Sequence, residues 1–184
     1  MTVSLLDFIR ALLMFTVASV VFVEVIGYFW HRFAEHNGLF GKMVQYRHRI
    51  HHEQDYPADN LRPANAVRYK SSGSWTWYVL AAVSVGGMFL VAPLKDAVPM
   101  AIGSIFYAKY IVNYFHESFH LENRRLHRFH WFRRLTKLHD IHHWMPGNYG
   151  IVFFFMDRLF GTLVPEFPQP RIKKEIFPGR APTK

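Results

Sequence analysis

The sequence contains no cysteine in its 184 residues. This absence excludes disulfide bonds, zinc–thiolate sites and iron–sulfur clusters held by this chain alone. The sequence also lacks a dense cluster of carboxylates, which excludes the metal site of soluble four-helix carboxylate proteins. If the chain binds a metal ion, side chains other than thiolates must supply most of the ligands.

Long stretches with almost no charge are abundant. Residues 11–30 carry one charge, residues 75–94 carry none, and residues 97–115 carry only Lys109. Each run is long enough to cross a bilayer, and this length argues against buried helices of a soluble core. The first run has no small-residue cleavage site and continues directly into "HRFAEH", so we interpret it as an uncleaved span. We expect an all-α integral membrane bundle with about three transmembrane helices, the last two forming a hairpin that turns at Lys95-Asp96.

The positive charges are distributed unevenly. Nineteen of the 22 Lys and Arg lie in 31–73, 116–150 and 151–184; the others are Arg10, Lys95 and Lys109. With three spans these nineteen fall on one side, which the positive-inside rule makes cytoplasmic, and the N-terminus lies outside. A basic cytoplasmic face suits anionic lipids or an acidic protein, and no motif indicates nucleic-acid binding. The compact chain without a dilysine ending favours a bacterial inner membrane over the endoplasmic reticulum.

All twelve histidines lie in residues 31–52 or 116–143, directly after the first and third runs. Ten of them form four short boxes: His31-x4-His36, His48-x2-His51-His52, His116-x3-His120 and His139-x2-His142-His143. Positions i, i+3 and i+4 share one side of a helix, so we expect the members of each triplet to converge. The predicted topology brings all four boxes to one membrane face, as a cytoplasmic His-rich helical cap.

Ten convergent imidazoles suffice for two metal ions. Imidazole binds iron, zinc, copper and nickel, so the ligand type does not name the metal. The nearby acids Glu35, Glu53, Glu117 and Asp140 are better interpreted as groups that orient the imidazole rings. A single box could be solvated or core histidines, but four boxes on one face make that interpretation unattractive.

His127 and His130 stand apart from the boxes. On one straight helix over 127–143, His130 would lie about 180° around the axis from His139. We therefore exclude both from the ligand set and interpret "HRFHWFRR" as an amphipathic interfacial segment. Pro146-Gly147 is expected to end the helix that carries the last box, because neither residue sustains a helix.

The boxes "HRFAEH", "HRIHH", "HESFH" and "HDIHH", followed by "NYG" and "DRLFGT", resemble the fatty acid hydroxylase/sterol desaturase superfamily over about residues 25–164. The resemblance implies an all-helical membrane fold with two iron ions held by the ten box histidines. It also implies that Asn148 and Tyr149 neighbour the active site. The implied activity is hydroxylation or desaturation of an apolar lipid with dioxygen.

The electrons for such a reaction must come from a separate protein, because no flavin or nicotinamide motif is present. An acidic ferredoxin or cytochrome is the expected donor. Two alternatives remain open. The first boxes also resemble those of carotenoid ring hydroxylases, and a non-catalytic membrane metal store or transporter would use histidines too. A transporter needs ionisable groups along a path through the bilayer, whereas these histidines collect beyond the helix ends.

Two charges within the apolar runs suggest a substrate channel. Glu24 and Lys109 each precede a box histidine by seven residues, almost two helical turns. An isolated charge at that depth costs about 3 kcal/mol, which favours pairing. We expect Glu24 and Lys109 to approach each other, with Tyr28 and Asn113 on the same stripes, and to bind a polar group of the substrate.

The chain is expected to form one domain, residues 1–164, followed by a Pro-rich basic tail, residues 165–184. Within the domain, "IVFFFMDRLFGTLV" at 151–164 is too short to span a bilayer and too apolar to be free in solution. We expect it to lie in the membrane interface as part of the substrate entrance.

Overall fold

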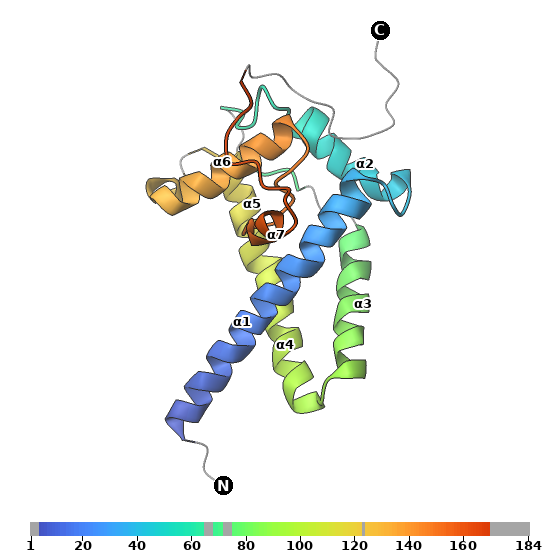
Figure 1. Ribbon diagram of the computed structural model, residues 1–184, viewed down its shortest axis with the longest axis vertical. Helices are drawn as coiled ribbons and strands as arrows, with labels where there is room; N and C mark the ends of the chain where they lie inside the picture. The colour runs from blue at the N-terminus through green and yellow to red at the C-terminus, as the bar shows by residue number, and fades with distance from the viewer. Residues whose placement is uncertain (1–3, 65–67, 72–74, 123, 170–184) are drawn as a thin grey trace.

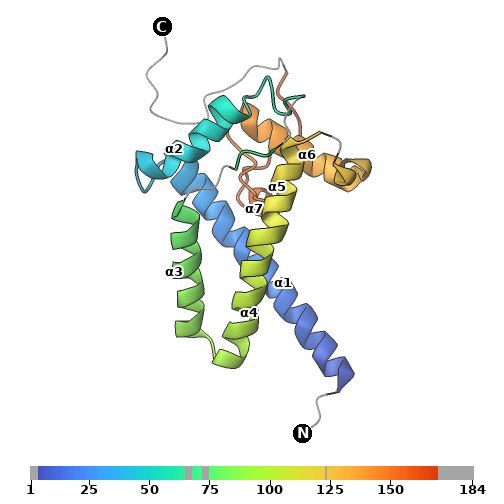
Figure 2. The same ribbon diagram turned by 180° about the vertical axis from the view of Figure 1, so that it is seen from behind.

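The computed structural model describes residues 4–64, 68–71, 75–122 and 124–169. Of three long rods, two form a hairpin and the first crosses the hairpin obliquely, and shorter helices form a cap across one end (Figures 1 and 2). No strand occurs within these ranges, which confirms the all-helical expectation. The rods are α1 (Leu5–Phe29), which continues as the π-helix η1 (Trp30–His36), α3 (Trp75–Val91), and the continuous run α4 (Leu94–Phe106), η3 (Tyr107–Val112) and α5 (Asn113–His120).

The first rod is a long apolar helix. Ser4 caps its N-terminus by accepting a hydrogen bond from the Asp7 backbone N–H. Within the described residues, Leu5–His36 is the one helix long and apolar enough to cross a membrane, and α3 is a shorter apolar helix. Large apolar side chains such as Leu6, Leu13 and Val17 are more than half exposed. A surface of this kind suits lipid better than water.

The second and third rods form the expected hairpin, but its turn is not at Lys95-Asp96. The turn falls at residues 92–93, and α4 begins at Leu94 with Pro93 as its N-cap. Lys95 and Asp96 therefore lie in the first turn of α4. This position suits an acidic residue, because a carboxylate interacts favourably with the positive end of the helix dipole.

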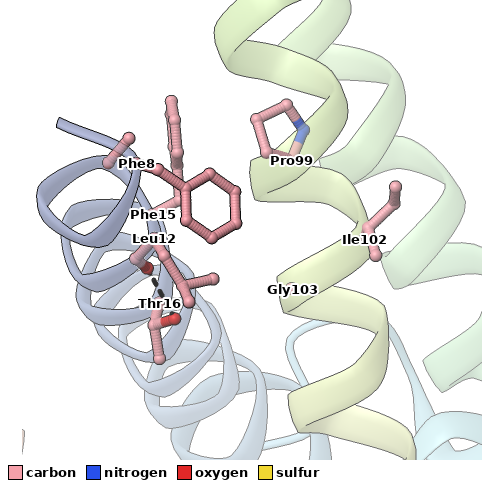
Figure 3. A pocket seen from close by; sticks show the side chains of 8 residues that line it. Phe8, Leu12, Phe15, Thr16, Pro99, Ile102 and Gly103 are labelled. Atoms are coloured by element: carbon pink, nitrogen blue, oxygen red, sulfur yellow. Dashed lines mark hydrogen bonds between the residues drawn. The ribbon is translucent and has the colours of Figure 1, made fainter. Parts of the chain in front are cut away.

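The first and third rods cross closely through small residues. Ser19 donates a hydrogen bond to the Met100 carbonyl at 3.2 Å, and a Cβ on Gly103 would lie 2.5 Å from Ser19 Oγ. Small residues at a helix crossing let the two backbones approach. Towards the N-terminus the same two helices enclose an apolar groove of about 430 Å³, lined by residues that include Phe8, Phe15 and Pro99 (Figure 3).

The cap consists of α2 (Lys42–Ile50), the π-helix η2 (His51–Asp55), the 3₁₀ turn η4 (Arg125–Arg128), α6 (His130–Trp144) and α7 (Phe155–Leu159). Of the stretch 127–143, His127 lies in the η4 turn, whereas His130 and His139 lie on one helix, α6. Its end is as expected, since α6 stops at Trp144, just before Pro146-Gly147. The segment 151–164 holds a helix of only five residues, and Met156 and Asp157 on it are buried.

The structure describes the predicted tail only as far as residue 169, and residues 170–184 lie outside the described part of the chain. The division into a domain, residues 1–164, and a tail, residues 165–184, stays a prediction.

Candidate metal centre

Nine of the ten box histidines form two groups at the junction of the rods and the cap. In each group the candidate donor atoms lie within 4.8 Å of one another. The first group is His31, His36, His48, His52 and His142; the second is His51, His116, His120 and His139. His143 lies beside the second group, with its ring centroid 4.9 Å from those of His120 and His139. The structure therefore brings all ten predicted ligands together, but around two points.

Helical phase explains why each triplet divides. Residue i+4 lies about 40° from residue i in one direction and residue i+3 about 60° in the other. His48 and His52 accordingly point to the first group and His51 to the second. The later triplet does the reverse: His139 belongs to the second group and His142 to the first. The expectation that the three histidines of a triplet face one point is therefore wrong, because each triplet contributes to both groups.

A change of backbone brings His31 and His36 together. Five residues of α-helix would turn them about 140° apart. In a π-helix the hydrogen bond joins residues i and i+5, so these residues lie above one another. The segment Trp30–His36 is a π-helix, and the Nε2 atoms of His31 and His36 are 3.2 Å apart. His116 and His120, four apart, converge on the ordinary α-helix α5.

The spacing of the ring nitrogens fits a metal ion. His36 Nε2 lies 2.9 Å from His48 Nε2, 3.1 Å from His142 Nε2 and 3.2 Å from His31 Nε2. One nitrogen, which carries either one proton or one lone pair, cannot form hydrogen bonds with three such neighbours at once. With metal–nitrogen bonds of about 2.1 Å, donors at right angles lie about 3.0 Å apart and tetrahedral donors about 3.4 Å apart. The first group thus has the spacing of nitrogen ligands around one metal ion.

Unpartnered atoms support the second site. Both ring nitrogens of His51 and Nε2 of His143 are buried and lack a hydrogen-bond partner among the described residues. Leaving such groups unsatisfied costs about 1–3 kcal/mol each. In the same group the Nε2 atoms of His120 and His139 are 3.0 Å apart. A cation bound in this group would satisfy one nitrogen of each ring.

Backbone carbonyls hold four of the ten rings by their other nitrogen. Nδ1 of His31 faces the Tyr149 carbonyl and Nδ1 of His142 the Gly147 carbonyl, both at 2.8 Å. His143 and His120 face the carbonyls of Tyr56 and Leu61 at 2.8 and 3.1 Å. A carbonyl can only accept, so these Nδ1 atoms carry the proton and Nε2 is left as a metal donor.

Burial also keeps the cap histidines neutral. It lowers the pKa of these rings well below 6.5, and neighbouring histidines lower the pKa further for His48, His51, His52, His139, His142 and His143. Because a metal ion binds the neutral ring, the site is ready for metal at neutral pH.

The segment after α6 positions the first group. Asn148 adopts a positive φ of 53°, and its side chain bonds to the backbone of Leu138 and Val164. The Asn148 side chain therefore holds two backbone segments together and is not directed at the histidines. Tyr149 is a direct neighbour, because its ring centroid lies 5.3 Å from that of His36. Asp157 accepts hydrogen bonds from the backbone N–H groups of Tyr149 and Gly150, both at 2.7 Å.

A cavity of about 600 Å³ reaches both groups. Its wall includes His31 and His48 of the first group and His116 and His139 of the second. The remainder is mostly apolar and comes from α1, α3 and the α4–α5 rod, with residues such as Phe22, Val23, Ile26, Leu80, Val85 and Ile105. A mostly apolar cavity bordered by a cluster of metal-type ligands can hold an apolar chain beside the metal.

The residues expected to line one substrate channel do not lie together in the structure. Lys109 and Asn113 line the cavity, whereas Glu24 and Tyr28 do not. The expected Glu24–Lys109 ion pair is wrong for the described structure. Glu24 instead accepts hydrogen bonds from the Tyr107 hydroxyl at 2.7 Å and the Phe153 backbone N–H at 3.1 Å. Lys109 is exposed, with Nζ 5.3 Å from the centroid of the Tyr110 ring.

Both leftover histidines lie away from the two groups. His127 Nε2 donates to the Ser118 carbonyl at 2.7 Å, and His130 is exposed at the start of α6. Neither belongs to a group of candidate donors.

Sequence reasoning missed residues that contact the site but lie far from the histidine boxes in the sequence. The Tyr69 hydroxyl lies 3.2 Å from His116 Nδ1, and Trp77 donates to Glu35 at 2.7 Å. These contacts join positions 47 and 42 residues apart, and no local spacing could have signalled them. Asp157 did lie within a quoted motif, "DRLFGT", but its part in holding residues 149 and 150 depends on the fold.

A family model described as "Fatty acid hydroxylase" matches residues 16–162. This match covers most of the chain and every histidine box, so the chain belongs to the fatty acid hydroxylase family. Comparison with curated proteins and with solved structures gives no match. The family is membrane-associated and uses metal, in agreement with the apolar first helix and the two histidine groups.

Proposed function

We propose that this protein is a membrane di-iron oxygenase that hydroxylates or desaturates a long apolar lipid. One observation carries the proposal. Two groups of buried histidines, with ring nitrogens at metal-ligand spacing, border the same apolar cavity. A metal store would need the ligands but not a cavity of about 600 Å³ that leads to them.

Bound iron would supply the activation of dioxygen, a reaction that side chains alone do not perform. Hydroxylation converts a C–H bond to C–OH, with O₂, two electrons and two protons consumed and one water formed. Desaturation removes two hydrogens and forms two waters. The chain's own residues hold the metals, place the lipid carbon beside them and exclude water with an apolar wall.

The proposed topology has three spans: α1, α3 and the α4–α5 rod. The histidine groups and the C-terminus lie on the cytoplasmic side. The exposed arginines of η4 and α6, namely Arg125, Arg128, Arg133 and Arg134, fit an acidic ferredoxin or cytochrome as electron donor. Reduction by such a donor should slow as ionic strength rises, and a rate that does not depend on salt would contradict this docking mode.

The function is tested on protein purified without oxygen. We expect two iron ions per chain and uptake of dioxygen once reductant and lipid are supplied. Lipid profiles of cells that express the wild type or His142→Ala should differ by an oxidised lipid present only with the wild type. Exchangeable zinc with no reaction toward dioxygen would favour a metal store and contradict the proposal.

A further inference from the structure

Glu35 differs from the other acids near the boxes in what its carboxylate faces. Glu53, Glu117 and Asp140 form ion pairs with Arg49, Arg124 and Arg62. Glu35 is 2% exposed, and its Oε2 lies 3.7 Å from Nδ1 of His48. The sequence predicted that four acids orient imidazole rings. In the structure, the carboxylate of Glu35 faces a ring nitrogen of a box histidine at ion-pair distance.

The geometry at His48 shows which ring nitrogen would bind a metal and which faces Glu35. His48 Nε2 lies 2.9–3.0 Å from the Nε2 atoms of His36, His31 and His52, so Nε2 is the donor to a metal in the first group. Nδ1 must then carry the proton, and it faces Glu35. A separation of 3.7 Å is within ion-pair range but longer than a hydrogen bond.

Trp77 fixes the other end of the carboxylate. Its Nε1–H donates to Glu35 Oε1 at 2.7 Å, and it reaches across from α3 to the π-helix at the end of α1. Glu35, Trp77 and His48 all line the same cavity. The contact chain therefore runs from the wall of the cavity, through one carboxylate, to a ligand of the first group.

We propose that Glu35 is a positioning residue of the first metal group: held by Trp77, it orients the His48 ring and strengthens His48 as a ligand. The proposal rests on the proposed function. Its physical basis is that a carboxylate facing the outer nitrogen of a ligating histidine fixes the ring and raises its basicity. It also places negative charge near a site whose ten ligands are all neutral, which offsets part of the charge of the metal ions.

The test compares metal release from Glu35→Gln, Trp77→Phe and the control Glu117→Gln, in full-length protein loaded with Fe(II) or Co(II). Glu35→Gln retains the shape and an acceptor for Trp77 but removes the charge. We expect one of the two metals to leave about 10–100 times faster to a chelator, because losing an outer partner weakens metal affinity by that factor. The visible spectrum of the Co(II) protein should change as well.

Trp77→Phe should shift release of the same metal in the same direction by a smaller factor. Glu117→Gln, next to ligand His116 but paired with Arg124, should stay within about twofold of wild type. Release from Glu35→Gln at the wild-type rate would overturn the proposal, and so would equal acceleration by Glu117→Gln. Thermal unfolding of the metal-free proteins separates positioning from folding, since Glu35→Gln keeps an acceptor for Trp77 and should unfold at a midpoint similar to that of the wild type.

Different results would contradict the proposed function and the role of Glu35. A wild type that binds fewer than two metals contradicts the proposed function itself. A wild type that binds two metals, together with variants that release both at the normal rate, contradicts only the role of Glu35.

Discussion

The two histidine groups perform the same geometric task with different backbones. In the first group the leading pair is five residues apart and converges because Trp30–His36 is a π-helix. In the second group the leading pair is four residues apart and converges on the α-helix α5. The first group then takes His48 and His52 from the first triplet and His142 from the second. The second group takes His51 from the first triplet and His139 from the second, together with His143 if that residue is counted with it. Each half of the chain thus contributes one ligand to the group that the other half builds.

The supports of the two groups differ too. The first depends on the 147–150 segment, whose carbonyls hold His31 and His142. The second depends on the carbonyls of Tyr56 and Leu61 and on the Tyr69 hydroxyl. Disturbing one segment should therefore weaken one metal more than the other.

The largest effect is expected at the two exchanged ligands, His51 and His142. Alanine at either position removes the one ligand that a group receives from the opposite triplet, and we expect lipid oxidation to fall to background. Metal analysis should show less than two metals per chain, with membrane insertion retained because both residues lie outside the predicted spans. Normal turnover by His51→Ala would show that the second group does not need its exchanged ligand.

Acid should destabilise the metal-free protein next most strongly. The buried cap histidines have pKa values well below 6.5, while in the unfolded chain they take up protons near pH 6.5. The unfolded state binds more protons, so the free energy of unfolding decreases as pH falls below about 6.5. Thermal unfolding between pH 8 and pH 5 measures this. His142→Ala, which removes one such ring, should show a shallower dependence on pH, and an equal slope would contradict the assignment.

Asp157 offers a way to disturb one group selectively. Alanine there removes acceptors from two buried backbone N–H groups, which we expect to cost about 2–3 kcal/mol of the free energy of unfolding. Because residues 149 and 150 position His31, one metal should leave faster while the other is retained. Tyr69→Phe is the matched change beside the second group. Loss of both metals in parallel from each variant would show that the groups are not supported separately.

The sequence predicted which histidines come together better than how they are arranged. Box spacing identified ten histidines, all of which the structure brings to one region. Spacing assumes α-helical periodicity, so it could not anticipate that a π-helix at Trp30–His36 aligns His31 with His36. Spacing also could not predict that each triplet contributes to two groups, because that depends on where the other triplet lies in space.

Contacts between distant segments were equally hidden. Depth along two helices suggested that Glu24 and Lys109 meet, but depth says nothing of rotation about the bundle. Tyr107 and the backbone of Phe153 occupy the carboxylate instead. The hairpin turn was misplaced because two charges suggested a loop, whereas Pro93 at a helix start favours Leu94 onward as helix.

The smallest effect is expected at His127 and His130, which belong to neither group. The predicted helical phase turned His130 away from His139, and the same phase holds in the structure because α6 contains both residues; His127 lies before this helix, in the η4 turn. His127→Ala removes a hydrogen bond to Ser118 at 2.7 Å, worth about 1 kcal/mol of stability. His130→Ala changes an exposed side chain and should cost less than about 0.5 kcal/mol. The double variant should therefore retain two metals per chain and turnover within about twofold of wild type. Loss of one metal from this variant would show that the second group, with four clustered donors and His143 beside it, takes a further ligand from the η4 turn.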